Sequence, residues 1–266
     1  MNINRFIAIL LLVLPVAAQA DSLFKKELAG GRTLPLAFGI GIDYFTLDQP
    51  YEMDSLTLNA PPGVPFPTIA DLSLIKTSSD ATNTDVKFDV WLLPFLNVFA
   101  VYGQVDGDTV VDLSNIGVPL PPEITRLAFD YDGDVYGVGA VLVVGGDRWF
   151  ATLASTFTDT SLGGGFNTSV QTTTIQPRVG LRFGDKLEGW VGGYMIDTEE
   201  SHSGTINLDL GFGPLPITFA ADLSQKKDFN LSAGVHVTLS QSWEATLEIG
   251  GGDRDTVLAN LTYRFE

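Results

Sequence analysis

Two histidines are the first candidates for chemistry in this sequence of 266 residues. His202 lies beside Glu199 and Glu200, and an imidazole next to carboxylates could act as a general acid or base. His236 lies within an alternating segment, at a position that would face inward. Neither histidine has the serine or aspartate pattern that nucleophilic or water-activating chemistry requires. We therefore expect no enzyme, a solvated His202 in a loop and a hydrogen-bonded His236.

A run of aspartates is the second candidate. Asp130, Asp132 and Asp134 alternate along the chain, and alternate residues of a strand share one face. Their carboxylates could hold Ca²⁺ weakly, with Asp106 and Asp108 on a neighbouring strand. The spacing is not that of an EF-hand, and a solvated acidic rim explains the same residues. We expect no other cofactor than loosely bound divalent cations.

The elements that position these residues repeat every two residues. Apolar positions alternate with small or polar ones from Phe229 to Leu239 and from Val257 to Phe265. Stretches of about ten such residues are the length of a tilted strand that crosses a bilayer. We predict an all-β fold, an up-and-down antiparallel transmembrane β-barrel. Its ten strands are expected at about 34–47, 83–93, 97–107, 126–144, 148–159, 168–183, 188–198, 228–239, 243–250 and 255–265.

The predicted connections differ in length. Tight turns follow four strands, whereas 48–82, 108–125 and 199–227 are predicted to be long extracellular loops. Three similar Pro-rich segments lie in these loops, GVPFP at 63–67, GVPLP at 117–121 and GPLP at 213–216. We interpret each as the tip of a hairpin that rises above the membrane. Alternatively, 54–76 and 204–226 are two further spanning strands, which would give twelve.

Aromatic residues near the tight turns are expected to mark one membrane interface. Tryptophan prefers this depth because its ring is apolar and its N–H needs a polar partner. Trp91, on the opposite parity from its apolar neighbours, leaves a bulge or a wrong strand boundary open. The expected interface aromatics are Trp91, Trp149, Trp190, Trp243 and Phe265.

Charged residues at the small-or-polar positions should face the lumen. Both signs occur there, so pairs could fill a narrow interior or line a small pore. A ten-stranded barrel is barely wider than the eight-stranded ones that side chains fill, and we expect a largely plugged lumen. The lumen charge set is Asp85, Lys87, Asp89, Arg178, Arg182, Glu244, Glu248 and Arg264.

The N-terminus resembles a signal peptide over residues 1–20, with an apolar run from Phe6 to Leu14 and a small-x-small end. Its removal leaves 14 basic and 32 acidic side chains, a net charge of −18. That acidity argues against binding nucleic acid. Residues 21–33 would form a short periplasmic segment, and 34–266 a single barrel domain with both termini periplasmic.

The last strand, Leu258 to Phe265, resembles the C-terminal signature of outer-membrane barrel proteins, although Glu266 follows the Phe. That resemblance implies recognition by the barrel-assembly machinery in the outer membrane of a Gram-negative cell, next to lipopolysaccharide. The segments 91–108 and 247–254 resemble a group of uncharacterised proteobacterial barrels, which implies no activity. The omptin proteases are also ten-stranded, but their pattern needs acidic residues and a histidine at the extracellular rim.

Three functions remain from the sequence. We favour a non-enzymatic outer-membrane barrel with a structural or surface-interaction role through its acidic loops, whose extracellular ligand the sequence does not identify. The alternative is a narrow channel or transporter for small or apolar solutes, because inward glycines (Gly39, Gly41, Gly180 and Gly234) would leave room inside. A surface hydrolase that uses His202 is the least favoured.

Overall fold

The computed structural model describes residues 35–59, 61–62, 71–117, 125–163, 167–209, 213–225 and 229–266. The expected signal peptide and the segment 21–33 lie outside the described residues. One 3₁₀ turn, η1 (Leu72–Leu74), accompanies the strands. The strands are β1 (Phe38–Asn59), β2 (Lys76–Leu93), β3 (Leu96–Asp112), β4 (Arg126–Gly145), β5 (Trp149–Leu162), β6 (Asn167–Phe183), β7 (Leu187–Asp209), β8 (Pro214–Gln225), β9 (Phe229–Thr238), β10 (Trp243–Gly251) and β11 (Asp255–Phe265).

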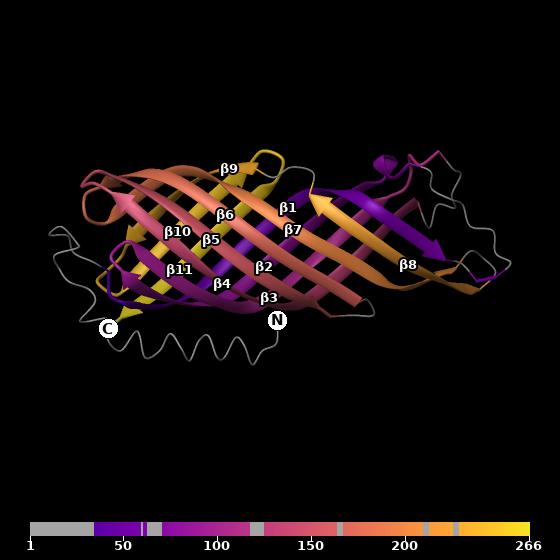
Figure 1. Ribbon diagram of the computed structural model, residues 1–266, viewed down its shortest axis with the longest axis horizontal. Coiled ribbons are helices and arrows are strands. Elements are labelled where there is room, and N and C mark those ends of the chain that lie inside the picture. The colour runs from indigo at the N-terminus through magenta and orange to yellow at the C-terminus, as the bar shows by residue number, and fades with distance from the viewer. Residues whose placement is uncertain are drawn as a thin grey trace.

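Ten strands close into an antiparallel barrel, as the alternating sequence predicts. The ring runs from β1 through β7 to β9, β10 and β11, and β11 pairs with β1 from Phe38↔Phe265 to Asp48↔Asp255. Short connections at 94–95, 146–148, 184–186 and 239–242 gather at one end, which we call the turn end (Figure 1). The C-terminus lies at this end. We call the opposite end the long end.

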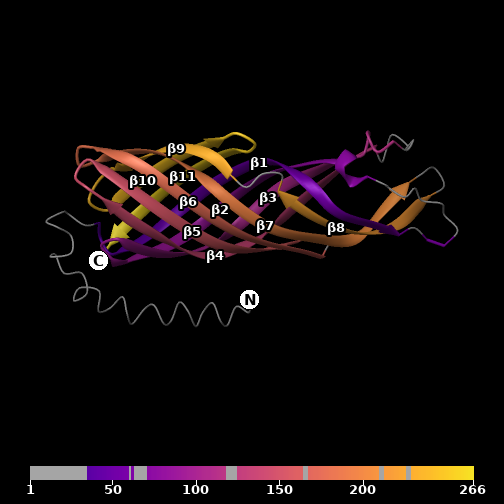
Figure 2. The same cartoon turned by 45° about the horizontal axis from the view of Figure 1, so that its top comes forward.

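The one described strand that is not part of this ring is β8. It pairs with the far part of β7, from Glu200 to Asp209, and with the far part of β1, from Tyr51 to Asn59. The hairpin of β10 and β11 ends nearer the turn end, before the wall reaches β8, as Figures 1 and 2 show. The wall therefore continues past this hairpin, and β8 is neither a spanning strand nor a loop.

The long loops expected at 48–82, 108–125 and 199–227 are therefore wrong in large part. Strands β1, β2, β3 and β7 run far into these ranges, and β8 fills most of the third. The physical reason is that strand pairing continues beyond the membrane, where polar residues and prolines are tolerated. The hairpin interpretation is confirmed for β7 and β8, which pair through Asp209↔Pro214 at the Pro-rich segment. Two hairpins, β5–β6 and β10–β11, end before the other strands do. We call the parts of β1–β4, β7 and β8 that continue beyond these two hairpins the extension.

A belt of exposed apolar side chains surrounds the ten-stranded part. Ile42 is 58% exposed, Val191 61% and Leu231 67%, values that water would penalise but lipid chains favour. The belt also includes Ile40, Val86, Leu142, Val144, Leu153, Ile175, Val179, Leu181, Val235, Leu247, Ile249 and Leu261. No helix in the described ranges is long and apolar enough to cross a membrane. The belt marks the chain as a membrane-spanning barrel.

The extension has an apolar core of its own. Ile75, Val111, Leu113 and Ile116 are buried together, and Met53, Leu56, Leu72 and Leu127 pack against them. We call these eight residues the apolar cap. Two turns hold it in place: Asp71 accepts hydrogen bonds from Ser73 beside Leu72, and Asp112 accepts one from the Ser114 N–H at 2.8 Å beside Leu113. These bonds lower the pKa of both carboxyls.

Candidate functional site: the barrel lumen

The barrel interior contains a long cavity of about 1900 Å³. At the turn end it is lined by Gly146, Asp185 and Gln241, and towards the long end it reaches Tyr131 and His202. This cavity passes the charged residues in between rather than stopping at them. The largely plugged lumen expected from the sequence is therefore wrong, because side chains narrow the interior without filling it.

The expected lumen charge set does lie inside the barrel. Seven of its eight residues line the cavity, and Glu248, 1% exposed, is buried in the wall against Arg178. The charges pair across intervening strands, Arg178 of β6 with Glu248 of β10 and Arg264 of β11 with Asp89 of β2.

The first group of charges lies near the turn end. The Arg264 guanidinium contacts the Asp89 carboxylate at 3.0 Å and the Glu244 carboxylate at 2.5 Å, and Asn97 donates to Asp89 at 2.7 Å. Strand β1 separates Arg264 from Asp89, and Gly39 is the residue opposite both. A side chain there would collide with Asp89, since an added Cβ would lie 2.4 Å from Oδ2. Gly39 thus lets this buried triad form.

The second group joins β6 and β10, with β7 and β9 between them. Arg178 contacts Glu248 at 2.5 Å and lies over the Trp190 ring at 5.3 Å from its centre. Its neighbour Tyr194 is 2% exposed. Arg and Trp attract through the charge distribution of the ring, and this contact adds to the ion pair in fixing the position of Arg178.

Two further groups complete the set. Arg182 contacts Glu188 at 2.7 Å, donates to the carbonyl oxygens of the β4–β5 turn and lies over the Phe150 ring. Lys87 contacts Asp43 at 3.5 Å, and Asp85 lies directly opposite Asp43 on the next strand. Asp43 and Glu188 also line the lumen, but the sequence analysis did not include them. Their positions in the alternating pattern predict inward side chains and could have identified them.

The inward glycines do not leave empty space, which corrects the expectation for them. An added Cβ on Gly180 would lie 2.4 Å from the Phe150 ring, and one on Gly234 2.4 Å from the Trp190 ring. On Gly41 it would meet the Thr262 hydroxyl at 2.6 Å. These glycines let neighbouring side chains pack directly against the backbone of the wall.

The expected interface aromatics divide into two groups. Trp149 and Trp243 are 53% and 43% exposed on the outside, and Trp243 packs on Tyr263, which stacks on Phe265. Trp91 and Trp190 instead line the lumen, so for them the prediction is wrong. Nearness to a turn sets a residue's depth but not the face on which it lies. The bulge considered near Trp91 is present, between Trp91 and Leu93.

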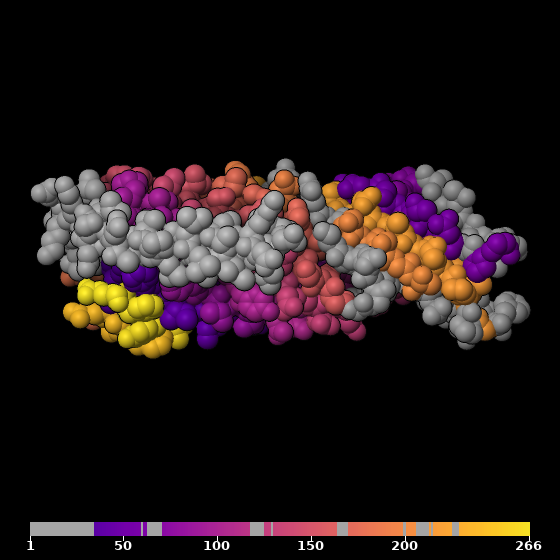
Figure 3. All heavy atoms as spheres, turned by 60° about the horizontal axis from the view of Figure 1, so that its bottom comes forward, coloured from indigo at the N-terminus to yellow at the C-terminus, as the bar shows by residue number. Residues whose placement is uncertain are grey.

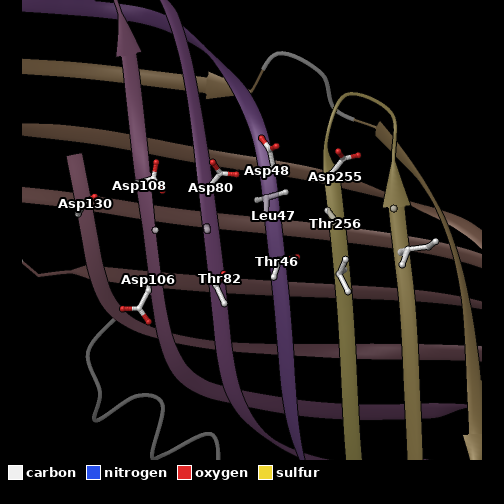
Figure 4. Close-up of a pocket in the computed structure, with 15 residues that line it drawn as sticks. Thr46, Leu47, Asp48, Asp80, Thr82, Asp106, Asp108, Asp130, Asp255 and Thr256 are labelled. Carbon is white, nitrogen blue, oxygen red and sulfur yellow. The ribbon is translucent and has the colours of Figure 1, made fainter. Parts of the chain in front are cut away.

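The aspartates considered for Ca²⁺ face outward on β4 and are exposed. Among the described residues, no three acidic or histidine side chains form a group that could hold a metal ion. Asp130 instead ends a row of five aspartates directly opposite one another on neighbouring strands: Asp255, Asp48, Asp80, Asp108 and Asp130. Figure 4 shows this row along a shallow groove outside the barrel. Like charges in such positions repel.

Neutralising the centre of this row should stabilise the barrel. We expect Asp80→Asn to raise the urea midpoint of unfolding from lipid vesicles at low salt, because each like-charged pair costs about 0.2 to 1 kcal/mol. The gain should shrink in 1 M salt, where screening acts over about 3 Å. The control is Glu52→Gln, whose partner on β8 is Ser224. An equal gain in both variants would contradict the repulsion.

The two histidines lie far apart along the lumen. His236 is close to the turn end, and its Nδ1 is 3.0 Å from the Thr246 hydroxyl. His202 lies in β7, opposite Thr168 and Ala221, and not in the expected loop. They cannot share one reaction centre.

Comparisons with known proteins assign no activity to the chain. No family model matches the chain, and the comparison with curated proteins gives no match. The transport unit of the Escherichia coli autotransporter AIDA-I is 14% identical over 94% of this chain and 96% of its own, with a TM-score of 0.40. The E. coli outer membrane protease OmpT is 9% identical over 88% and 99% (TM-score 0.45), and Pseudomonas aeruginosa OprG is 10% identical over 87% and 98% (TM-score 0.43).

Proposed function

For this outer-membrane β-barrel protein, we propose the function of a narrow channel for small solutes. The observation that supports it is the cavity that continues past Arg178 and Glu244, from the turn end to His202. Each arginine that lines the cavity is paired with a carboxylate, whereas Asp85 lies opposite a second carboxylate, that of Asp43. We propose no catalytic role, because His236 bonds to a threonine and lies far from His202.

The proposed orientation places the turn end and the C-terminus in the periplasm and the extension outside the cell. Short turns on the periplasmic side and longer structures outside are the rule for such barrels. The partners are then outer-membrane lipid and lipopolysaccharide, and the barrel-assembly machinery during insertion. The outward aspartate row, in this orientation, lies where divalent cations bound to lipopolysaccharide would offset its repulsion.

Planar-bilayer recording with the refolded mature chain tests the channel. We expect stable, reproducible steps of small conductance. Arg178→Ala should raise the conductance and shift the selectivity toward cations, because it removes the guanidinium and leaves the Glu248 carboxylate unpaired. Gln171→Ala on the outside of the same strand should change neither value. A correctly folded barrel that never conducts above the bare bilayer would remove the proposal.

A structural or surface-interaction role is the second candidate. It is favoured by the extension, whose own apolar cap gives a rigid body beyond the belt. This role predicts a defect in envelope integrity or adhesion that is rescued by a folded chain whose lumen is blocked. If only conducting variants rescue the defect, the channel is the function.

A further inference from the structure

The charges of the lumen do not cancel. Among the described residues, the four charge groups contain four basic and six acidic side chains. The groups built on Arg178 and Arg182 each have one carboxylate for one cation. The groups built on Lys87 and Arg264 each have two carboxylates for one cation. A cavity whose wall carries an excess of one sign attracts ions of the opposite sign, so this excess favours cations.

Within the described part of the chain, one carboxylate of the Lys87 group is left without a cation of its own. Asp85 lies directly opposite Asp43 on the neighbouring strand, and it is Asp43 that Lys87 contacts, at 3.5 Å. Asn260 also donates a hydrogen bond to Asp43. The Asp85 Oδ1 atom rests against Gly103, where an added Cβ would lie 2.3 Å away, and it accepts no hydrogen bond from any described residue. A buried oxygen of this kind is normally satisfied by water or by an ion.

The Arg264 group differs because both of its carboxylates are bonded. The guanidinium contacts Asp89 at 3.0 Å and Glu244 at 2.5 Å, and Asn97 donates to Asp89. The group also lies near the turn end, where the Arg264 N–H bonds to the Ser242 carbonyl oxygen of the last short turn. Water and salt outside the barrel screen charges at this level.

Asp85, in contrast, lies at the depth of the apolar belt. It occupies the middle of β2, and its neighbour Val86 is 51% exposed on the outer face, as is Ile42 (58%) beside Asp43. The cavity continues from there towards both ends of the barrel. Figure 3 shows the yellow C-terminal strands and the orange and indigo strands of the extension at opposite ends of one face. Since hydrocarbon surrounds the wall at the belt, water outside the barrel cannot screen the two carboxylates, and their field is confined to the lumen.

We propose that the lumen conducts small cations in preference to anions, and that Asp85 is the residue that sets this preference. The ion preference deepens the proposed channel function and rests on it. A cation that passes this level serves as the counter-ion of Asp85, whereas an anion is repelled by both carboxylates. Lys87 reduces the repulsion but does not remove it, because one cation faces two carboxylates.

Planar-bilayer recording of the refolded mature chain in a KCl gradient tests the preference. The reversal potential gives the permeability ratio of K⁺ to Cl⁻, and we expect K⁺ to be the more permeant ion. Asp85→Asn, which keeps the shape of the side chain, should lower the ratio about two- to fourfold, because one charge acts on ions over roughly 10 Å. The matched control Asp197→Asn removes a charge from the exposed outer face of β7 and should leave the ratio unchanged.

A further variant separates the position of the charge from the total charge. Glu244→Gln removes the same charge from the lumen, but near the turn end, and should lower the ratio by less than Asp85→Asn does. An equal fall in the two variants would overturn Asp85 as the determinant, since the total charge would then explain the selectivity.

The absence of cysteine from the sequence allows the charge at Asp85 to be set after folding. In Asp85→Cys, a negatively charged methanethiosulfonate should restore the K⁺ preference, and a positively charged one should make Cl⁻ the more permeant ion. A conducting barrel whose ratio ignores both reagents, once labelling is verified by mass, contradicts the role of Asp85 and leaves the channel standing. An unmodified barrel that prefers Cl⁻ does the same. A folded barrel that never conducts contradicts the channel itself.

Discussion

Arg264→Met should destabilise the barrel more than any other single substitution considered for this chain. Asp89 and Glu244, on the two sides of Arg264, would lose their shared cation, and the Asp89 side chain is only 3% exposed. Removal of one partner from a buried ion pair costs about 3 to 5 kcal/mol, because a buried charge remains uncompensated. The measurement is urea unfolding from lipid vesicles, followed by the mobility shift of the folded barrel on gels.

Matched variants identify the cause. Arg264→Lys keeps the charge but not the two-sided geometry, and it should recover part of the loss. The double variant Arg264→Met with Asp89→Asn should be more stable than Arg264→Met alone, since one of the two carboxylates that lost their cation is then replaced by a neutral amide. If the double variant is less stable than the single one, lost packing and not lost pairing explains the effect.

Gly234→Ala should also be costly, although alanine is the smallest possible addition. The new Cβ would lie 2.4 Å from the Trp190 ring and 2.8 Å from the Leu247 carbonyl oxygen. The ring is held between this glycine and Arg178, so it cannot move without breaking the stacking. Overpacking of this kind costs about 1 to 3 kcal/mol.

Gly189→Ala provides a control of opposite sign. Its added Cβ would meet nothing closer than 3.5 Å, and Gly189 lies on the adjacent strand β7. Replacing a glycine where the backbone needs none stabilises by about 0.4 to 1 kcal/mol, because the unfolded chain loses freedom. The two urea midpoints should therefore move in opposite directions. Equal shifts would show that the Trp190 contact is not what makes Gly234 necessary.

The sequence predicts the ring well because a period of two assigns each residue to lipid or lumen. The ten strands and all eight lumen charges follow from that parity. The partners do not follow, since Arg264 meets Asp89 across an intervening strand and only the missing side chain of Gly39 permits it. Trp190 was misplaced because its position near a turn was given more weight than its parity. Strand length was underestimated wherever pairing continues beyond the membrane.

Strand β1 has two different partners on one edge, β11 near the turn end and β8 in the extension. Those partners lie more than 150 residues away along the chain, so the seam of the barrel closes late in folding. Pairing over such separations is slow because loop closure must precede it. The backbone N–H and C=O groups on this edge of β1 remain unpaired until both β8 and β11 have been synthesised. A nascent chain that ends after β8 could pair only residues 51–59 of β1. Residues 38–48 of β1 would remain unpaired on this edge and could pair with a strand of another protein.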